Sequence, residues 1–263
     1  MSDRFRGKTV LVTGASSGIG RGLALACAAE GATLHVADVD AEGLERLASS
    51  TGARPHVCDV RDPSANEELV AAVGDLDVAF LNAGVNGAPS LLQPGGTLDT
   101  LPPSEWSRVL RINLDGLFYG LQACARVMKP RRNGSVVVTA STAGLRAEPR
   151  VSYPYVASKA AAVGLVKQAA LELAPFGVRV NAIAPGPVVT NIGGAKRSPE
   201  GAAAWQRTIP LGRWGQVPDV VGLALLLASD DAGWMTGGIH VVDGGAGALT
   251  QITADELPGP ADQ

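Results

Sequence analysis

The sequence predicts an α/β fold, in which one doubly wound sheet of seven mostly parallel strands carries helices on both faces. Short apolar runs alternate with longer segments of helix-like apolar spacing, as in βαβ units. Hydrophobic residues make up 46% of the 263 residues and charged residues 18%, which is enough apolar material for a core. Aromatic residues make up only 4%, so small and β-branched side chains must fill that core, as suits buried parallel strands.

The expected elements follow one another along the chain with short connections. We expect strands at Lys8–Thr13, Thr33–Ala37, Arg54–Val57, Leu76–Leu81, Ser135–Ala140, Val178–Ile183 and Ile239–Val242. We expect helices at Gly18–Gly31, Ala41–Ser49, Pro63–Val73, Ser104–Met128, Tyr155–Leu173 and Val217–Ser229. No linker rich in Pro, Gly and Ser divides the chain, so we expect a single domain over 1–263. Its core would span 8–245, followed by a polar, mobile tail at about 248–263.

Two segments, Val85–Pro103 and Thr190–Pro210, show the apolar spacing of neither a helix nor a strand and are expected to be irregular. Each follows a predicted strand. In a doubly wound fold, ligands bind in the loops beyond the carboxyl ends of the strands. These two segments are therefore the predicted walls of a ligand site. Arg197 and Arg207 lie in the second segment, where we interpret them as solvated charges rather than as contacts for a charged substrate.

Composition excludes several classes of function. The net charge of −3 provides no basic surface for nucleic acid. The three cysteines, Cys27, Cys58 and Cys124, are far apart and the histidines are scattered, so neither a disulfide framework nor a metal site is expected. The chain lacks an apolar signal region and a membrane-length apolar run. We therefore expect a cytoplasmic protein that binds no metal, membrane or nucleic acid.

A glycine-rich turn, Thr13-Gly-Ala-Ser-Ser-Gly-Ile-Gly20, connects the first predicted strand to the first predicted helix. Glycines permit a tight turn and close backbone approach, and a helix N-terminus presents free N–H groups to a pyrophosphate. The spacing of Gly14, Gly18 and Gly20 differs from GxGxxG, but the physical basis is the same. The turn indicates dinucleotide binding; the alternative is a purely structural turn.

Asp38 follows the second predicted strand, where a carboxylate can accept hydrogen bonds from both ribose hydroxyls of an adenosine. The same charge would repel a 2′-phosphate. The neighbouring positions hold Ser17 and Val39 rather than a basic residue that could bind that phosphate. We therefore favour NAD over NADP as the cofactor, the alternative being an aspartate that merely ends a strand.

Tyr155 and Lys159 stand at positions i and i+4 of a predicted helix, so their side chains share one face. A nearby ammonium favours the phenolate and lowers the pKa of a tyrosine, which can then exchange a proton with an alcohol or a ketone. Ser141 follows the fifth predicted strand and could bind the substrate oxygen. The spacing alone also occurs by chance on surface helices. Tyr153 is a weaker candidate, because Ala157 occupies the position four residues later.

Several further short motifs lie between Lys8 and Gly245. They are Asp59-Val60, Asn82-Ala83-Gly84, Asn113, Tyr155-Val-Ala-Ser-Lys159, Pro185-Gly186 with Thr190, and Val242-Asp-Gly-Gly245. Together with the glycine-rich turn and Ser141, this ordered set resembles the short-chain dehydrogenase/reductase family, in its NAD-preferring branch. The resemblance implies a Rossmann-type fold, with Tyr155 as general acid/base and Lys159 holding the nicotinamide ribose. It also implies that Ser141 positions the substrate oxygen and that Asn113 holds a water.

The glycine-rich turn and the resemblance together define an expected ligand site. Cofactor contacts are expected from Gly14, Ser16, Ser17, Gly18, Ile19, Gly20, Asp38, Val39, Asp59, Val60, Asn82, Ala83, Gly84, Tyr155, Lys159, Pro185, Gly186, Val188 and Thr190. Substrate contacts are expected from Asn86, Leu145, Tyr153, Pro187, Ile192 and Trp205. The substrate set is mixed and moderately apolar, without an anchor for phosphate or carboxylate. It favours a neutral secondary alcohol, such as a cyclic alcohol, a sugar, a steroid-like ring or a β-hydroxy compound.

The sequence therefore predicts an NAD-dependent oxidoreductase that interconverts a secondary alcohol and a ketone. Three alternatives remain: an NADP-dependent carbonyl reductase, a catalytically idle NAD-binding regulator, and a scaffold protein. The resemblance also implies a homotetramer. Its interfaces would form from the segments Ser104–Met128 and Tyr155–Leu173 and from the Ile239–Gly245 region.

Overall fold

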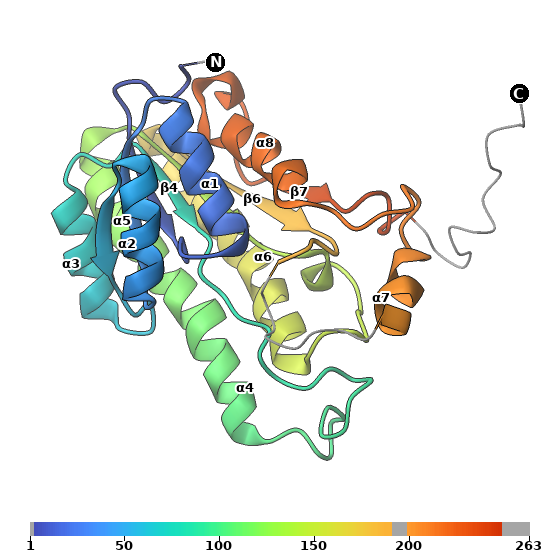
Figure 1. Cartoon of the computed structure of the whole chain (residues 1–263). Helices are drawn as coiled ribbons and strands as arrows, with labels where there is room; N and C mark the ends of the chain where they lie inside the picture. The colour runs from blue at the N-terminus through green and yellow to red at the C-terminus, as the bar shows by residue number, and fades with distance from the viewer. Residues whose placement is uncertain (1–2, 191–198, 249–263) are drawn as a thin grey trace, which may run out of the picture.

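A computed structural model describes residues 3–190 and 199–248, which form one seven-stranded sheet (Figure 1). The strands are β1 (Thr9–Thr13), β2 (Thr33–Asp38), β3 (Arg54–Val57), β4 (Val78–Leu81), β5 (Gly134–Thr139), β6 (Val178–Pro185) and β7 (Ile239–Val242). Their order is β3-β2-β1-β4-β5-β6-β7, and every neighbouring pair is parallel. The predicted doubly wound α/β fold is confirmed.

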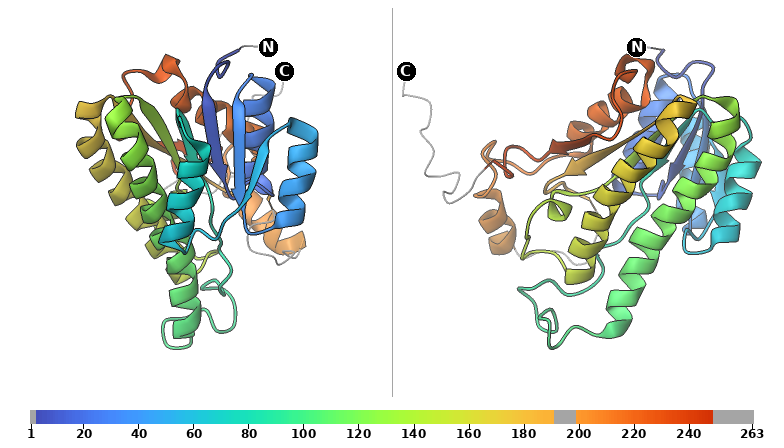
Figure 2. Two further views of the ribbon diagram at one scale, coloured as in Figure 1. Left: turned by 90° about the vertical axis from the view of Figure 1, so that its left-hand side faces the viewer. Right: turned by 180° about the vertical axis from the view of Figure 1, so that it is seen from behind.

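Two layers of helices cover the sheet (Figure 2). The helices are α1 (Gly18–Ala29), α2 (Ala41–Thr51), α3 (Pro63–Val73), α4 (Pro103–Leu110), α5 (Gly116–Arg131), α6 (Tyr153–Leu173), α7 (Pro199–Gln206) and α8 (Val217–Ala228). Buried side chains of α1, α2 and α8 form one hydrophobic core with the sheet. Those of α3, α5 and α6 form a second core on the opposite face. The alternation of strand and helix along the chain therefore produces a three-layer molecule.

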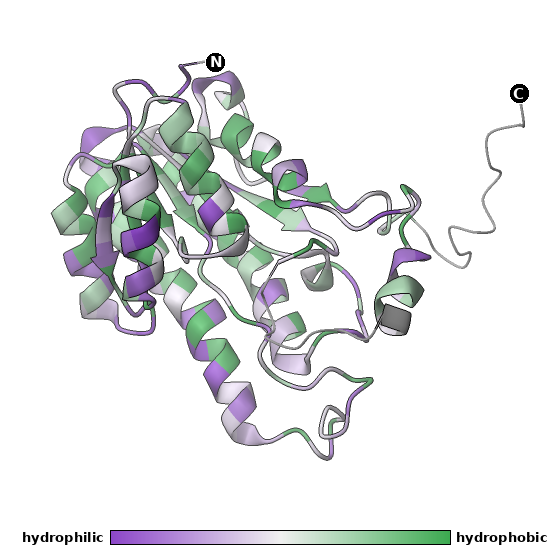
Figure 3. Cartoon of the chain, viewed as in Figure 1, coloured by the Kyte–Doolittle hydropathy of each residue, from purple (hydrophilic) through white to green (hydrophobic). Residues whose placement is uncertain are grey.

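The apolar strands account for both cores. Along β1, Val10 and Val12 belong to the core under α1 and α8, whereas Leu11 belongs to the core on the other face. This is the two-residue period of a strand that is buried on both sides. In Figure 3 the strands are largely hydrophobic, while hydrophilic stretches appear on α2, on α4 and on the loops.

Two predicted segments differ from the structure. The predicted helix Ser104–Met128 is divided into α4, a π-helical turn η1 (Arg111–Asp115) and α5. The backbone stays helical at both junctions, at Leu110 and Asp115, so the apolar spacing gives no sign of the π turn. The segment Thr190–Pro210, predicted to be irregular, contains α7. The tail predicted to be mobile lies outside the described residues from 249 onward.

The ends of the helices differ in how their free backbone N–H groups are satisfied. The N-cap side chains Asp40, Asp62 and Ser152 accept backbone hydrogen bonds at the start of α2, α3 and α6. At α1 the N-cap Ser17 makes no such bond, and the first turn contains no acidic residue. The N-terminus of α1 therefore keeps the partial positive charge of its free N–H groups.

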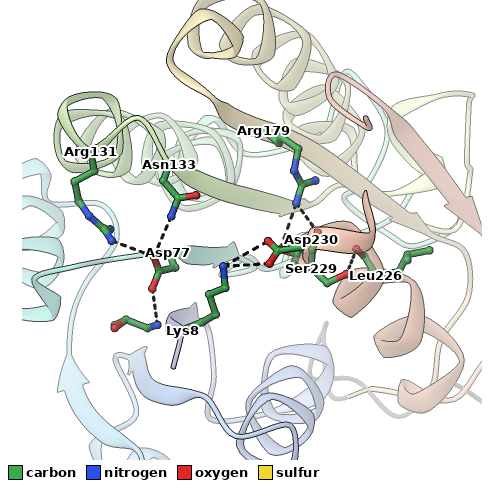
Figure 4. A network of polar contacts seen from close by, with 10 residues as sticks. Lys8, Asp77, Arg131, Asn133, Arg179, Leu226, Ser229 and Asp230 are labelled. Carbon is green, nitrogen blue, oxygen red and sulfur yellow. Dashed lines mark hydrogen bonds and ion pairs between the residues drawn. The ribbon is translucent and has the colours of Figure 1, made fainter. Parts of the chain in front are cut away.

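The amino ends of the strands form one edge of the sheet, where charged side chains are paired with each other and with the backbone (Figure 4). Lys8 lies 3.3 Å from the Asp230 carboxylate. Asp77 accepts hydrogen bonds from the Thr9 amide, Arg131 and Asn133. The Arg179 guanidinium donates to the carbonyl oxygens of Leu227, Ala228, Ser229 and Met235. This network joins the end of α8 to the amino edge of the sheet.

The helices of residues 3–190 and 199–248 include none with the length and apolar character that a membrane crossing would need.

Candidate active site

A cavity of about 810 Å³ opens at the carboxyl ends of the strands. Its walls come from the segments at and after the ends of β1, β2, β3, β4, β5 and β6 and from the N-terminal part of α6. In Figure 1 this edge faces the side of the molecule where α7 and the segment before α4 lie. The volume lies within the range of small-molecule and cofactor sites.

The glycine-rich turn forms the floor of the cavity beside β1. Gly14 and Gly18 have φ values of +65° and +52°, which side chains other than glycine rarely adopt. A Cβ at Gly20 would lie 2.1 Å from the Gly14 carbonyl oxygen, and a Cβ at Gly14 would lie 2.7 Å from the Ala83 Cα. The turn is therefore tight and lies against the segment after β4. With the uncapped start of α1, it fits the pyrophosphate of a dinucleotide.

Asp38 is held rigidly at one end of the cavity. One carboxylate oxygen accepts hydrogen bonds from the Ser16 amide at 3.0 Å and the Ser16 hydroxyl at 2.7 Å. The other oxygen accepts one from the Asp40 amide at 3.2 Å. Each oxygen retains acceptor capacity, since a carboxylate offers about four lone-pair positions. The carboxylate is thus oriented and can still bind ribose hydroxyls.

Asp59 lies across the same end of the cavity and pairs with Arg61. The Arg61 Nε lies 2.9 Å from both oxygens of Asp59, and the Arg61 amide donates to one of them at 3.0 Å. These hydrogen bonds from Arg61 hold the pKa of Asp59 below its ordinary value. Because Arg61 is neutralised by Asp59, the charge of Asp38 dominates this end of the cavity.

Tyr155, Ser141 and Lys159 meet at the other end of the cavity. A side-chain hydrogen bond joins Tyr155 to Ser141. Ser141 lies two residues beyond the last residue of β5, and its hydroxyl oxygen accepts the Ala143 amide at 3.1 Å. Lys159 is one helical turn after Tyr155, and its Nζ lies 5.7 Å from the centre of the tyrosine ring. The predicted i and i+4 arrangement is present on α6.

Burial is the main cause of the shifted pKa values of Tyr155 and Lys159. Burial raises the pKa of Tyr155 above its ordinary value of 10.0, and the hydrogen bond with Ser141 opposes that rise. Burial also lowers the pKa of Lys159 from 10.5 to about 8. The sequence predicts a lowered tyrosine pKa through the ammonium, whereas desolvation has the larger effect here. A neutral phenol beside a partly desolvated ammonium is therefore the resting arrangement.

Asn113 lies behind the cavity, in the π-helical turn. Its side-chain amide donates to the Val85 carbonyl at 2.8 Å and to the Ser158 hydroxyl at 3.1 Å, while its oxygen accepts the Val85 amide at 2.8 Å. Ser158 in turn donates to the Tyr155 carbonyl at 2.8 Å. Asn113 therefore connects the segment after β4 to the helix that carries Tyr155. Its predicted role in holding a water stays a prediction.

The structure brings together almost all of the predicted cofactor positions. The cavity is lined by Gly14, Ser16, Ser17, Gly18, Ile19, Asp38, Val39, Asp59, Val60, Asn82, Ala83, Gly84, Tyr155, Lys159, Pro185, Gly186, Val188 and Thr190. Gly20 lies beneath the turn, where it permits the close approach to Gly14. Gly186 has a similar role, since a Cβ there would lie 2.5 Å from the Cβ of Asp243.

The predicted substrate positions are more dispersed. None of Asn86, Leu145, Tyr153, Pro187 and Trp205 lines this cavity, and Ile192 lies outside the described residues. The Asn86 side-chain oxygen accepts hydrogen bonds from the amide and the hydroxyl of Ser152. Trp205 is buried, and its ring contacts the ring of Trp214 and the guanidinium of Arg150. The identity of the substrate contacts remains a prediction.

Several lining residues were not predicted from the sequence, among them Arg61, Arg108 and Thr139. Arg61 follows Asp59 by two residues, and that proximity is the one signal that could have identified it. Arg108 reaches the cavity from α4, where it pairs with Glu105. Thr139 looks like an ordinary strand residue in the sequence. Residues 3–190 and 199–248 contain no cluster of His, Cys, Asp and Glu that could hold a metal ion.

Comparison with known proteins identifies relatives over nearly the whole chain. A family model described as enoyl-(acyl carrier protein) reductase matches residues 14–247. Levodione reductase of Leifsonia aquatica is 35% identical over 264 residues, covering 93% of this chain and 96% of that protein. A 3-oxoacyl-(acyl-carrier-protein) reductase of Thermotoga maritima is 36% identical over 253 residues, covering 92% and 98%.

Solved structures resemble the fold equally well. The crystal structure of levodione reductase superposes with a TM-score of 0.87 at 33% identity, covering 94% of this chain and 100% of that one. A 3-oxoacyl-(acyl-carrier protein) reductase from Brucella melitensis, solved with bound NAD, gives a TM-score of 0.84 at 33% identity. That comparison covers 93% of this chain and 92% of the other. The similarity therefore extends over most of both chains.

Proposed function

The chain belongs to the short-chain dehydrogenase/reductase family, and from that premise we propose that it is an NAD-dependent oxidoreductase that interconverts a secondary alcohol and a ketone. The observation that carries the proposal is the meeting of Tyr155, Ser141 and Lys159 at one end of a cavity whose floor is the glycine-rich turn. Dinucleotide-binding and proton-transferring groups thus share one site. The relatives that match include enzymes named as reductases, which supports the same class of reaction.

The cavity fits an extended dinucleotide. The pyrophosphate would lie at the glycine-rich turn and the start of α1, where free N–H groups face a site without acidic residues in the first turn. The adenosine ribose would bind Asp38, and the nicotinamide end would lie toward Tyr155 and Lys159. A nicotinamide bound there would accept or supply the hydride; the protein provides orientation and electrostatics.

The protein's own residues handle the proton. During oxidation, Tyr155 would first release its own proton to solvent, and its phenolate oxygen would then accept the hydroxyl proton of the alcohol as the carbon–hydrogen bond breaks. During reduction, the same oxygen would return a proton to the developing alkoxide. Ser141 would hold the substrate oxygen next to Tyr155, because its own hydroxyl is fixed by the Ala143 amide. The positive charge of Lys159 would stabilise the phenolate form.

Asp38 supports NAD as the cofactor. Its carboxylate is oriented by Ser16 and by the Asp40 amide, and Arg61, a cation of the same cavity wall, is neutralised by Asp59. A 2′-phosphate placed at this end would meet an unneutralised negative charge. The relative of known structure with bound NAD is consistent with this choice.

We infer a neutral, moderately apolar substrate, as the sequence predicts, and a homotetrameric cytoplasmic enzyme. Large apolar side chains are exposed on the elements expected at the interfaces, namely Phe118, Leu171 and Val241, and Leu226 and Trp234 are exposed outside those elements. Trp234 is fully exposed, which favours a covering partner. Light scattering that showed a stable monomer would contradict the assembly.

The activity is tested by supplying NAD with a panel of secondary alcohols, including cyclic alcohols, polyols and β-hydroxy esters, and measuring NADH absorbance. We expect NADH formation with at least one neutral secondary alcohol and a lower kcat/KM with NADP. Formation of NADPH at a higher kcat/KM would support the carbonyl reductase alternative. Tight NAD binding without turnover of any alcohol, or of the matching ketones in reverse, would support an idle regulator.

A further inference from the structure

Thr139 is the last residue of β5 and lies in the cavity wall between the glycine-rich turn and Lys159. The neighbouring strand β4 ends at Leu81, which is opposite Val138. No residue of β4 is therefore in register with Thr139. The Thr139 carbonyl lies just beyond the last paired residues of β4 and β5. The Lys159 Nζ donates to that carbonyl oxygen at 2.7 Å. The position of the buried ammonium thus depends on the end of β5.

The hydroxyl of the same threonine serves a different partner. It donates to the side-chain oxygen of Asn82 at 3.0 Å. The Asn82 amide nitrogen donates to the carbonyls of Thr13 at 3.2 Å and Gly14 at 3.3 Å, both in the glycine-rich turn. Because both ends of this amide are used, its orientation is determined by the hydrogen bonds. Thr139 therefore fixes Asn82, and Asn82 holds the turn.

The contact between Asn82 and the turn is close enough to transmit a displacement. The Asn82 Nδ2 lies 3.2 Å from the position of a Cβ at Gly14 and 2.6 Å from that of a Cβ at Gly20. The Asn82 backbone amide also donates to the Thr13 hydroxyl at 3.0 Å. A rotation of the Asn82 side chain would leave the Gly14 carbonyl without this donor and would loosen the turn.

We propose that Thr139 is a positioning residue that couples the glycine-rich turn to Lys159, its hydroxyl acting through Asn82 on the turn and its carbonyl acting on the ammonium. This inference rests on the proposed function, since it assigns the turn to the dinucleotide and Lys159 to the reaction. The consequence is that occupation of the turn and placement of Lys159 depend on one another. Loss of the hydroxyl alone should then impair both.

Thr139→Val separates the hydroxyl from the shape of the side chain, because valine has nearly the same volume and lacks the donor. We expect its Kd for NAD, measured by calorimetry, to rise about tenfold, since the Asn82 oxygen loses its partner. The alkaline limb of the kcat/KM profile should also move to lower pH, because a displaced carbonyl stabilises the Lys159 charge less well. Thr139→Ser, which keeps the hydroxyl, should restore both values.

A matched control is Thr236→Val. Thr236 accepts the Val180 amide near the amino edge of the sheet, so its loss should lower stability and leave the Kd for NAD unchanged. Thr139→Ala replaces the valine variant if valine prevents folding. If Thr139→Val has the wild-type Kd for NAD and the wild-type pH profile, the coupling is contradicted and the proposed function is not. The same holds if Thr139→Ser has a Kd and a pH profile no closer to wild type than those of Thr139→Val. Failure of the wild type to bind NAD or NADP would contradict both the coupling and the proposed function.

Discussion

The two edges of the sheet use the same kinds of charged residue in different ways. At the amino edge, Lys8 is paired with Asp230, and Arg179 donates to several carbonyls at the end of α8. At the carboxyl edge, Lys159 donates to one carbonyl among the residues that the structure describes, and Asp38 keeps unused acceptor positions beside a large cavity. Charges that are satisfied internally stabilise the fold, and charges that keep free capacity are available for a ligand.

The difference arises from how parallel strands are connected. Most strands enter the sheet at the amino edge from a helix through a short connection, which brings helix ends and side chains into direct contact. At the carboxyl edge the segments after β4 and β6 are long, and the segments that leave this edge diverge to leave a cavity. We therefore expect substitutions at the amino edge to change stability and those at the carboxyl edge to change activity.

The largest expected effect is that of Tyr155→Phe on turnover. The variant removes the only hydroxyl placed to exchange the substrate proton in the proposed mechanism, so kcat should fall by about 10²- to 10⁴-fold. Its Kd for NAD should stay within about twofold of wild type, as calorimetry can show. Tyr119→Phe, on α5 and away from the cavity, is the control and should keep full activity. A Tyr155→Phe enzyme with near-normal kcat would remove Tyr155 from the mechanism.

Arg179→Met should destabilise the protein most among changes at the amino edge. The four carbonyls at the end of α8 and beyond it would lose a charged donor, at a cost of about 2–4 kcal/mol in the free energy of unfolding. Lys8→Met, which breaks an ion pair with a largely exposed Asp230, should cost under about 1 kcal/mol. Urea unfolding measures both. A large loss of kcat/KM in folded Arg179→Met would contradict the expectation that substitutions at the amino edge change stability rather than activity.

His35, in the middle of β2, allows a test of how stability depends on pH. It is buried and its Nδ1 lies 2.9 Å from the Nε2 of His56. Burial, followed by the charges of His56 and Arg54, lowers the pKa of His35 from 6.5 to about 4. The unfolded chain therefore binds a proton in this window that the folded chain does not, so stability falls as pH drops below 6.5.

The loss between pH 7 and pH 5 should be about 2 kcal/mol, because one pKa unit corresponds to about 1.4 kcal/mol. His35→Asn, which cannot titrate, should show a smaller dependence on pH in urea unfolding. Equal wild-type stability at the two pH values would show that His35 accepts a proton in the folded state without cost.

Asp38→Asn should have a smaller effect than Tyr155→Phe, and it should change the cofactor preference. The asparagine keeps an oxygen for Ser16 and removes the negative charge, so the ratio of kcat/KM for NADP to that for NAD should rise about tenfold. Asp40→Asn, at the N-cap of α2, is the control and should leave the ratio unchanged. An unchanged ratio in Asp38→Asn would mean that another group sets the preference.

Much of the fold could be predicted because strand–helix alternation is a local property. The strands β3 and β7 and the helix α3 match their predicted bounds, and the pair Tyr155 and Lys159 lies as the helical spacing requires. The helix α7 was missed because eight residues with four small ones, Gly201 and Ala202–Ala204, give little apolar periodicity. Short elements of this kind are decided by tertiary packing.

The chemistry of the site was less accessible from the sequence. A spacing rule places Lys159 near Tyr155, but the direction of the tyrosine pKa depends on burial, which only the folded chain defines. Likewise, nothing in the sequence distinguishes Thr139 from other strand threonines. Its role follows from β4 ending one residue before β5. Arg61 shows the same limit, because its pairing with Asp59 depends on the turn after β3.

Hydrogen–deuterium exchange with and without saturating NAD tests most directly whether the carboxyl edge is the binding edge. We expect slower exchange in the glycine-rich turn at 14–20, at 59–61 and at 82–85, with no change at the amino edge around Asp77 and at 227–230. Unchanged exchange at the carboxyl edge in the presence of NAD, or protection at the amino edge in its place, would contradict the account.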